Sequence, residues 1–160
     1  MDARTDADSA GNEETEAERL ARNWNEILQE LRVVQTGTQI LMGFLLTLVF
    51  QQRFTELDGY QIVVYLVLVG LAALATILAL TPVGLHRALF RQHAKPQLVR
   101  AANVLLQATL VAVGLTLAGT ATLVFDVVAG HVAGFVVGGI TLVLTVSAWF
   151  LLPSTLRPRR

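Results

Sequence analysis

The stretch NWNEILQELRVVQTGTQIL, residues 23–41, starts as a charged amphipathic helix and becomes apolar without a turn signal between the two parts. Successive residues of a helix advance by about 100°, which puts the apolar side chains on one stripe and Glu26 and Glu30 on another. Neither Gly nor Pro occurs in residues 15–36. We therefore expect one continuous helix over residues 15–50, which enters a membrane once its charges end.

Three further apolar runs follow, and each is long enough to cross a bilayer, which takes about 20 mostly apolar residues. None of the three contains Asp, Glu, Lys or Arg. A soluble four-helix bundle would carry a polar face on each helix, and these runs lack one. The expected fold is therefore an all-α integral membrane four-helix bundle with a cytoplasmic amphipathic extension of the first helix. The expected spans are residues 33–50, 61–80, 104–124 and 132–152.

Composition agrees with a membrane domain flanked by two polar tails. Of the 160 residues, 54% are hydrophobic and 15% charged, with a mean hydropathy of +0.58, which is too apolar for an ordinary soluble domain. Residues 1–14 are acidic and polar, so we expect a disordered tail there. Residues 15–153 should form the transmembrane domain and residues 154–160 a basic tail. No cleavable signal peptide is visible.

The distribution of Lys and Arg predicts the orientation. Eleven of the twelve basic residues lie in the N-terminal segment, in the connection between the second and third spans, or at the C-terminus. The other two connections contain only Arg53. We therefore expect a multi-pass protein of the cytoplasmic (cell inner) membrane with both termini in the cytoplasm. Its basic residues should contact anionic lipid head groups on that side.

A first candidate site is a polar network at the cytoplasmic edge of the membrane. Glutamates of the first helix and arginines near the middle connection approach from the same side, and Glu30 should meet one of the latter. Exposed ion pairs contribute only about 0–1 kcal/mol each, so a network matters only where it is partly removed from water. The alternative is independently solvated charges. The candidate members are Glu26, Glu30, Arg32, Arg87, Arg91, Arg100 and Asn103.

A second set of candidates is polar groups within or at the ends of the spans: Gln35, Gln39, Gln107 and Asp126. Amides inside a bilayer need hydrogen-bond partners, because lipid offers none. The glutamines either bond neighbouring helices or a local water, or form a polar vestibule for an ion or small solute. Asp126 lies with His131 at the outer edge of the last hairpin. It is either an interfacial or capping carboxylate or a proton or cation acceptor.

The last span carries Gly130, Gly134 and Gly138 at a spacing of four residues. Small residues at that spacing let two helix backbones approach closely. The partner is either the third span of the same chain, through residues such as Ala118 and Thr122, or a second copy in a homo-oligomer. Sequence alone leaves both open.

Several motifs together resemble a known family. They are the stretch at residues 23–41, QRF at residues 52–54, PVGLHRALFR at residues 82–91 and VRAAN at residues 99–103. The chain resembles a family of small bacterial four-span membrane proteins of unassigned function over residues 20–150. The resemblance implies a membrane location and a shared architecture, and it supplies no active site. Some members carry a sodium/proton antiporter label. The spans of this chain contain no ionisable group near their middle, which coupled cation exchange usually needs.

The remaining motifs exclude several classes of function. There is no cysteine, no HExxH and no pair of histidines four residues apart on one helix, so we expect no metal site. There is no catalytic triad, GxGxxG or P-loop, so we expect neither catalytic residues nor a cofactor. The basic segments lack interleaved aromatics, which argues against nucleic acid. The sequence favours a non-enzymatic scaffold or accessory protein that binds lipid or a partner. The alternative is a small transporter or channel for protons or monovalent cations.

Overall fold

The computed structural model describes residues 16–89 and 95–151, and within these ranges every regular element is helical. The all-α architecture expected from the sequence is confirmed. Four of the helices are long and apolar enough to cross a membrane. The elements are α2 (Glu16–Leu48), η1 (Gln52–Glu56), α3 (Gly59–Leu89), α4 (Lys95–Ala129), α5 (His131–Val146) and the π-helical turn η2 (Ser147–Leu151).

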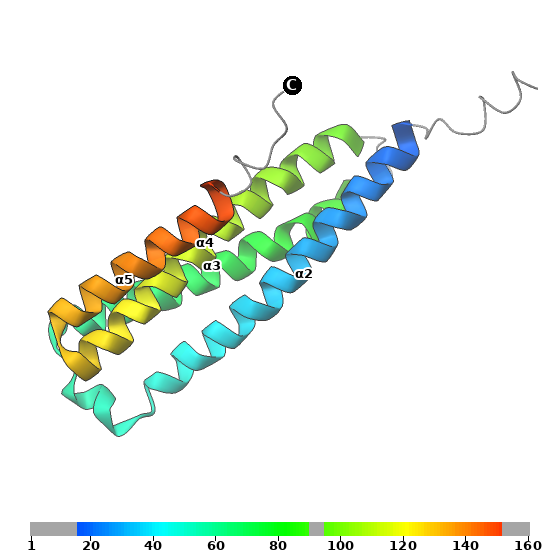
Figure 1. The fold of residues 1–160 in the computed structure, drawn as a ribbon. Helices are drawn as coiled ribbons and strands as arrows, with labels where there is room; N and C mark the ends of the chain where they lie inside the picture. The colour runs from blue at the N-terminus through cyan, green and yellow to red at the C-terminus, as the bar shows by residue number, and fades with distance from the viewer. Residues whose placement is uncertain (1–15, 90–94, 152–160) are drawn as a thin grey trace, which may run out of the picture.

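The four long helices run alternately up and down in one bundle (Figure 1). Within it, α4 packs against both α3 and α5, while α2 lies against α3 and α4. The start of α2 and the end of α5 lie toward the same end of the bundle, and η1 and the α4–α5 turn lie at the other (Figure 1). We call the second of these the turn end.

The helix α2 is unbroken from its charged part into its apolar part. It has 33 residues, and α3 and α4 have 31 and 35, whereas α5 has only 16. At 1.5 Å per residue the first three are each about 50 Å long, well beyond the roughly 30 Å of a hydrocarbon core. They therefore continue past the end of α5 as a three-helix extension (Figure 1).

Apolar packing holds this extension together. Trp24 of α2 and Ala102 of α4 are buried in one apolar cluster. Partly buried residues of α2, α3 and α4 pack against these two. A second layer follows one turn or two deeper, where Leu31, Ala79 and Leu106 meet. The apolar stripe seen in residues 23–41 thus faces the other helices. The Trp24 cluster comprises Trp24, Ile27, Leu28, Leu85, Val99 and Ala102.

Buried hydroxyl groups in the bundle bond to the backbone of their own helix. Thr109 and Thr116 of α4 donate to the carbonyls of Leu105 and Ala112, each at 2.7 Å. Thr38 of α2 donates in the same way over 2.9 Å. No buried side-chain nitrogen or oxygen in the described part of the chain lacks a partner. The interior is therefore fully satisfied despite its polar residues.

Two glycines bring α5 close to α4. A Cβ on Gly138 would collide with Thr122 Oγ1 and lie 3.1 Å from Thr122 Cβ. A Cβ on Gly134 would lie 2.8 Å from the carbonyl oxygen of Thr122. Gly134 and Gly138 therefore pack within the chain, against α4. Gly130 differs, because it forms the α4–α5 turn with φ 90°, a conformation that favours glycine.

Candidate functional site

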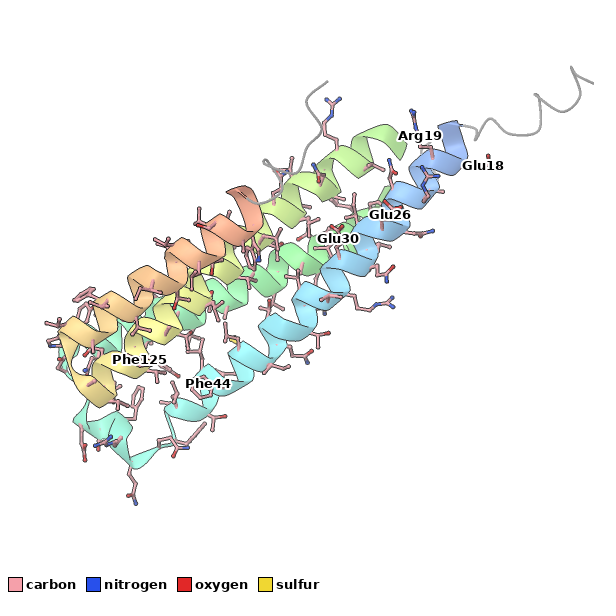
Figure 2. The ribbon with its side chains drawn as sticks, viewed as in Figure 1. Glu18, Arg19, Glu26, Glu30, Phe44 and Phe125 are labelled. Carbon is pink, nitrogen blue, oxygen red and sulfur yellow. The ribbon has the colours of Figure 1, made fainter. Side chains whose placement is uncertain are left out.

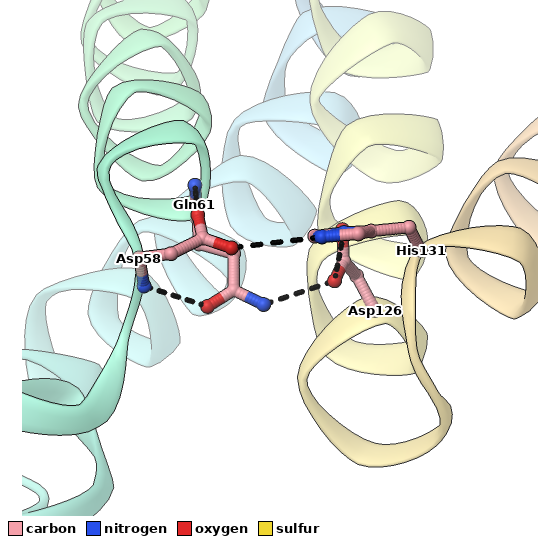
Figure 3. A network of polar contacts seen from close by, with 4 residues as sticks. All are labelled: Asp58, Gln61, Asp126 and His131. Atoms are coloured by element: carbon pink, nitrogen blue, oxygen red, sulfur yellow. Dashed lines mark hydrogen bonds and ion pairs between the residues drawn. The ribbon is translucent and has the colours of Figure 1, made fainter.

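Four polar side chains meet at the turn end and form what we call the turn network (Figure 3). Asp126 comes from the last turn of α4, and His131 is the first residue of α5. Asp58 directly precedes α3, and Gln61 lies in its first turn. The network therefore joins three helices at one end of the bundle.

Asp126 is the centre of this network, and its side chain is only 1% exposed. Gln61 Nε2 donates a hydrogen bond of 2.9 Å to Asp126 Oδ1. His131 Nδ1 lies 2.9 Å from both carboxylate oxygens. A buried carboxylate is tolerated only when it is paired, and here an amide and an imidazole from two other helices supply the partners.

Gln61 is oriented by a reciprocal cap at the start of α3. The backbone N–H of Gln61 donates to Asp58 Oδ1 over 2.8 Å, and the backbone N–H of Asp58 donates to Gln61 Oε1 over 3.1 Å. This is a capping box built from Asp and Gln three residues apart. Because the cap occupies Oε1, the amide presents its Nε2 to Asp126.

His131 closes the network from the solvent side. Its Nε2 lies 3.6 Å from Asp58 Oδ2, so each ring nitrogen faces a carboxylate. The side chain is 57% exposed. Tyr60 packs edge-on against the imidazole ring, with 5.7 Å between ring centroids, and also lies near Phe135. When the imidazole of His131 is protonated, its positive charge therefore lies between the partly exposed carboxylate of Asp58 and the buried carboxylate of Asp126.

The packing of α5 makes room for the buried carboxylate. A Cβ on Gly134 would lie 2.8 Å from Asp126 Cβ, one helical turn after His131. A larger residue at position 134 would push α5 away from Asp126 and move His131 with it. The glycine spacing and the polar network are therefore parts of one arrangement.

The turn network links α3, α4 and α5 through hydrogen bonds. Each described polar group bonds another member or the backbone of the same site, and the capping box fixes the amide. In residues 16–89 and 95–151, no group of three or more His, Cys, Asp or Glu side chains could hold a metal ion.

The sequence identified Asp126 and His131 as a pair but missed the link to α3. The capping box in the segment DGYQ, residues 58–61, was the available signal, because it indicates an oriented Gln61 amide. It does not say which residue the amide meets. Gln61 and Asp126 are 65 positions apart, and only the tertiary fold brings them together.

The network expected at the opposite end stays a prediction. Glu26 lies 3.8 Å from Arg22 on its own helix, and both side chains are more than half exposed. Glu30 lies on the same part of α2 (Figure 2) and is exposed. Residues Arg32, Arg100 and Asn103 are exposed too. Arg91 lies outside the described residues, as does the side chain of Arg87.

The glutamines of the spans are divided between two helices. Gln35 and Gln39 of α2 line a cavity of about 490 Å³ toward α3, where Thr76 contributes a hydroxyl that donates to the carbonyl of Ala72. Gln107 is exposed on α4. Within the described ranges, no hydrogen bond joins Gln35 to Asn103 or Gln107.

Comparison with known proteins identifies a family. The family DUF6328, described as a family of unknown function, matches residues 13–153, which is most of the chain. No curated protein matches the chain. No solved structure matches it either.

Proposed function

We propose that this chain, which belongs to the family DUF6328 of unknown function, is a multi-pass membrane protein with a scaffold or accessory role and no catalytic activity. The observation that carries the membrane assignment is the outer surface of the bundle. Large apolar side chains are exposed on all four long helices, for example Ile40, Leu66, Val111 and Val143. A soluble monomer does not expose apolar surface on that scale, whereas lipid would cover it.

We propose that both termini lie in the cytoplasm. The eleven basic residues of the N-terminal segment, the connection between the second and third spans, and the C-terminus would then face the negative leaflet, and the turn end would lie outside. Tyr60 at the same end suits a membrane–water interface.

In this orientation the three-helix extension projects from the membrane into the cytoplasm. Its outer surface on α2 carries exposed charges of both signs, including Glu18, Arg19, Glu26 and Glu30 (Figure 2). The Trp24 cluster holds α2 against α3 and α4, so these charges sit on a rigid support. A rigid charged projection next to the bilayer suits the binding of a partner protein or of anionic lipid.

One observation favours a second candidate function, a small transporter or channel. The cavity between α2 and α3 carries the carboxamides of Gln35 and Gln39 on a mainly apolar lining. No hydrogen bond to either amide occurs in the described part of the chain. Such groups could contact a proton-carrying water or a monovalent cation. None of the described residues that line this cavity is ionisable, which favours a passive pathway over coupled exchange.

Two measurements test the proposals. Extraction of cell membranes with alkaline carbonate should leave the chain in the membrane pellet, and its release into the supernatant would refute the membrane assignment. Purified protein in liposomes should then be assayed for proton, sodium and potassium flux. Flux no greater than in empty liposomes favours the scaffold. Flux that falls in a Gln35→Leu, Gln39→Leu variant favours the transporter.

A further inference from the structure

A cavity of about 660 Å³ lies at the turn end, on the side of α2 and η1. Its volume is within the range of small-molecule sites. None of the four residues of the turn network lines it. The walls come from the end of α2, from η1, from α3 and from the end of α4. Much of the lining is apolar, including Phe44, Leu48, Phe54, Tyr65, Leu123 and Val127.

Part of the cavity wall consists of residues that pack in the core of the bundle. Phe54 of η1 packs edge-on against Tyr65 of α3, with 5.0 Å between ring centroids. Tyr65 and Leu123 belong to a buried core cluster, against which Phe54 also packs. The short helix η1 is therefore anchored to the bundle through an aromatic contact, and the cavity beside it is a defined feature of the fold.

The mouth of the cavity is polar and carries a cation. Gln51, Gln52 and Arg53 line it. Arg53 is the only Lys or Arg between residues 32 and 87, and there is none between residues 100 and 157. The single Lys or Arg of this end of the bundle thus lines the entrance of its apolar cavity.

The guanidinium of Arg53 remains available to an anion. Its Nε lies 3.9 Å from Glu56 Oε2, and both side chains are more than 70% exposed. An exposed pair of this kind contributes little and competes weakly with a better acceptor. The planar guanidinium matches a phosphate, to which it can donate two parallel hydrogen bonds.

We propose that this cavity binds one anionic phospholipid of the outer leaflet, with an acyl chain against the apolar walls and the phosphate on Arg53. The inference rests on the proposed membrane location. An apolar interior with a cationic, amide-bearing mouth complements an amphiphile whose charge lies at one end. A net anionic head group suits the lone arginine better than a zwitterionic one, whose own cation would repel it.

The test uses full-length protein in phosphatidylcholine nanodiscs with trace amounts of phosphatidylglycerol that carries a photoreactive acyl chain. After irradiation, crosslinked peptides are mapped by mass spectrometry. Label should concentrate on peptides from the end of α2, η1 and the end of α4. Unlabelled phosphatidylglycerol should compete with the probe at least about fivefold better than phosphatidylcholine, as a contribution of about 1 kcal/mol implies.

Two pairs of variants isolate the charge and the cavity. Arg53→Gln should lower competition by phosphatidylglycerol about fivefold, whereas Arg22→Gln, which also removes an arginine from a helical pair with a glutamate, should not. Val124→Trp adds bulk to the cavity lining and should reduce the label. Val111→Trp is the matched control, an exposed valine of α4 that does not line the cavity.

Equal competition by the two lipids would overturn the lipid site, and so would label spread evenly over the exposed surface. Both readouts use the wild-type chain, so they hold even where a variant misfolds. Failure of the membrane proposal looks different. In that case alkaline carbonate would release the chain from membranes before any lipid is tested.

Discussion

The two ends of the bundle contrast a polar network at the turn end with the apolar Trp24 cluster at the other end. At the turn end, buried Asp126 is bonded by Gln61 from α3 and His131 from α5. At the opposite end, Trp24 of α2 packs on Ala102 of α4 with apolar neighbours around it. Hydrogen bonds are directional and fix which atoms meet, whereas the stability gained from apolar packing depends on how much volume is filled and how much surface is buried. The polar bonds of the turn end therefore fix the register of α3, α4 and α5. Apolar packing attaches α2, through the Trp24 cluster at one end and through Leu45, in the core cluster with Tyr65 and Leu123, toward the other.

The comparison also separates α5 from α2 within the bundle. The helix α5 is joined to α4 by a single residue, Gly130, and lies against it through Gly134 and Gly138. The helix α2 has no such close approach, because a Cβ at its Gly37 or Gly43 would meet nothing within 4 Å. The glycines of α5 thus lie much closer to a neighbouring helix than those of α2, so a side chain added at Gly134 or Gly138 should destabilise the protein more than one added at Gly37 or Gly43.

The largest loss of stability is expected from Trp24→Ala. This change removes the main side chain of the cluster that holds α2, and buried Trp-to-Ala changes cost about 3–5 kcal/mol. Thermal unfolding of the purified protein in detergent would measure it. Asn25→Ala, an exposed neighbour, should change the stability by less than about 0.5 kcal/mol. If the two variants melt together, the Trp24 cluster does not hold the extension.

Gly134→Leu should destabilise the hairpin by about 3 kcal/mol, because the new side chain must displace the backbone of α4 and Asp126 at once. Gly139→Leu is the matched control on the same helix, since a Cβ there meets nothing within 4 Å. Thermal unfolding should separate the two clearly. An equal effect of both would show that α5 packs elsewhere.

Asp126→Ala should cost about 2 kcal/mol, because it leaves Gln61 and His131 without their shared acceptor. Asp126→Asn keeps one carbonyl acceptor and should lose less. Glu56→Ala, an exposed carboxylate at the same end, should change the stability by less than about 0.5 kcal/mol. Gln61→Ala in the Asp126→Ala background should add less than in the wild type, since the two residues share one bond. Full additivity would contradict the direct contact.

The smallest effect is expected from Glu30→Ala. The Glu30 side chain is exposed on α2, so its removal should change the unfolding free energy by less than about 0.5 kcal/mol. The sequence-based network at this end requires a much larger effect, because a partly buried ion pair that loses one member costs about 3–5 kcal/mol. Chemical denaturation would distinguish these values. A loss of several kcal/mol would show that Glu30 is paired with one of the arginines near the middle connection.

The sequence predicts the helices well because long apolar runs admit few alternatives. The expected second span, residues 61–80, describes only the part of α3 that suits lipid, because α3 itself extends from Gly59 to Leu89 and passes through Pro82. Hydropathy marks the part of a helix that suits lipid, and it does not mark where the backbone hydrogen bonds stop. The spacing of Gly134 and Gly138 indicates close packing, yet only the fold identifies α4 as the partner.

The polar site was predictable only in part, for a related reason. Asp126 and His131 are near each other in sequence, so the hairpin alone brings them together. Gln61 reaches Asp126 from another helix, and the cavity beside Arg53 is formed by α2, η1, α3 and α4 together. Periodicity describes one helix at a time, and it contains no information about which faces of different helices meet.

Membrane topology is tested most directly by single cysteines, which the chain permits because it has none of its own. Thr55→Cys in η1 and Ala129→Cys beside the α4–α5 turn are exposed positions of the turn end, and Asn25→Cys is exposed on the three-helix extension. A membrane-impermeant maleimide applied to intact cells should label positions 55 and 129, and should label position 25 only after lysis. Labelling of position 25 in intact cells, with protection of 55 and 129, would contradict a turn network on the outer face of the membrane.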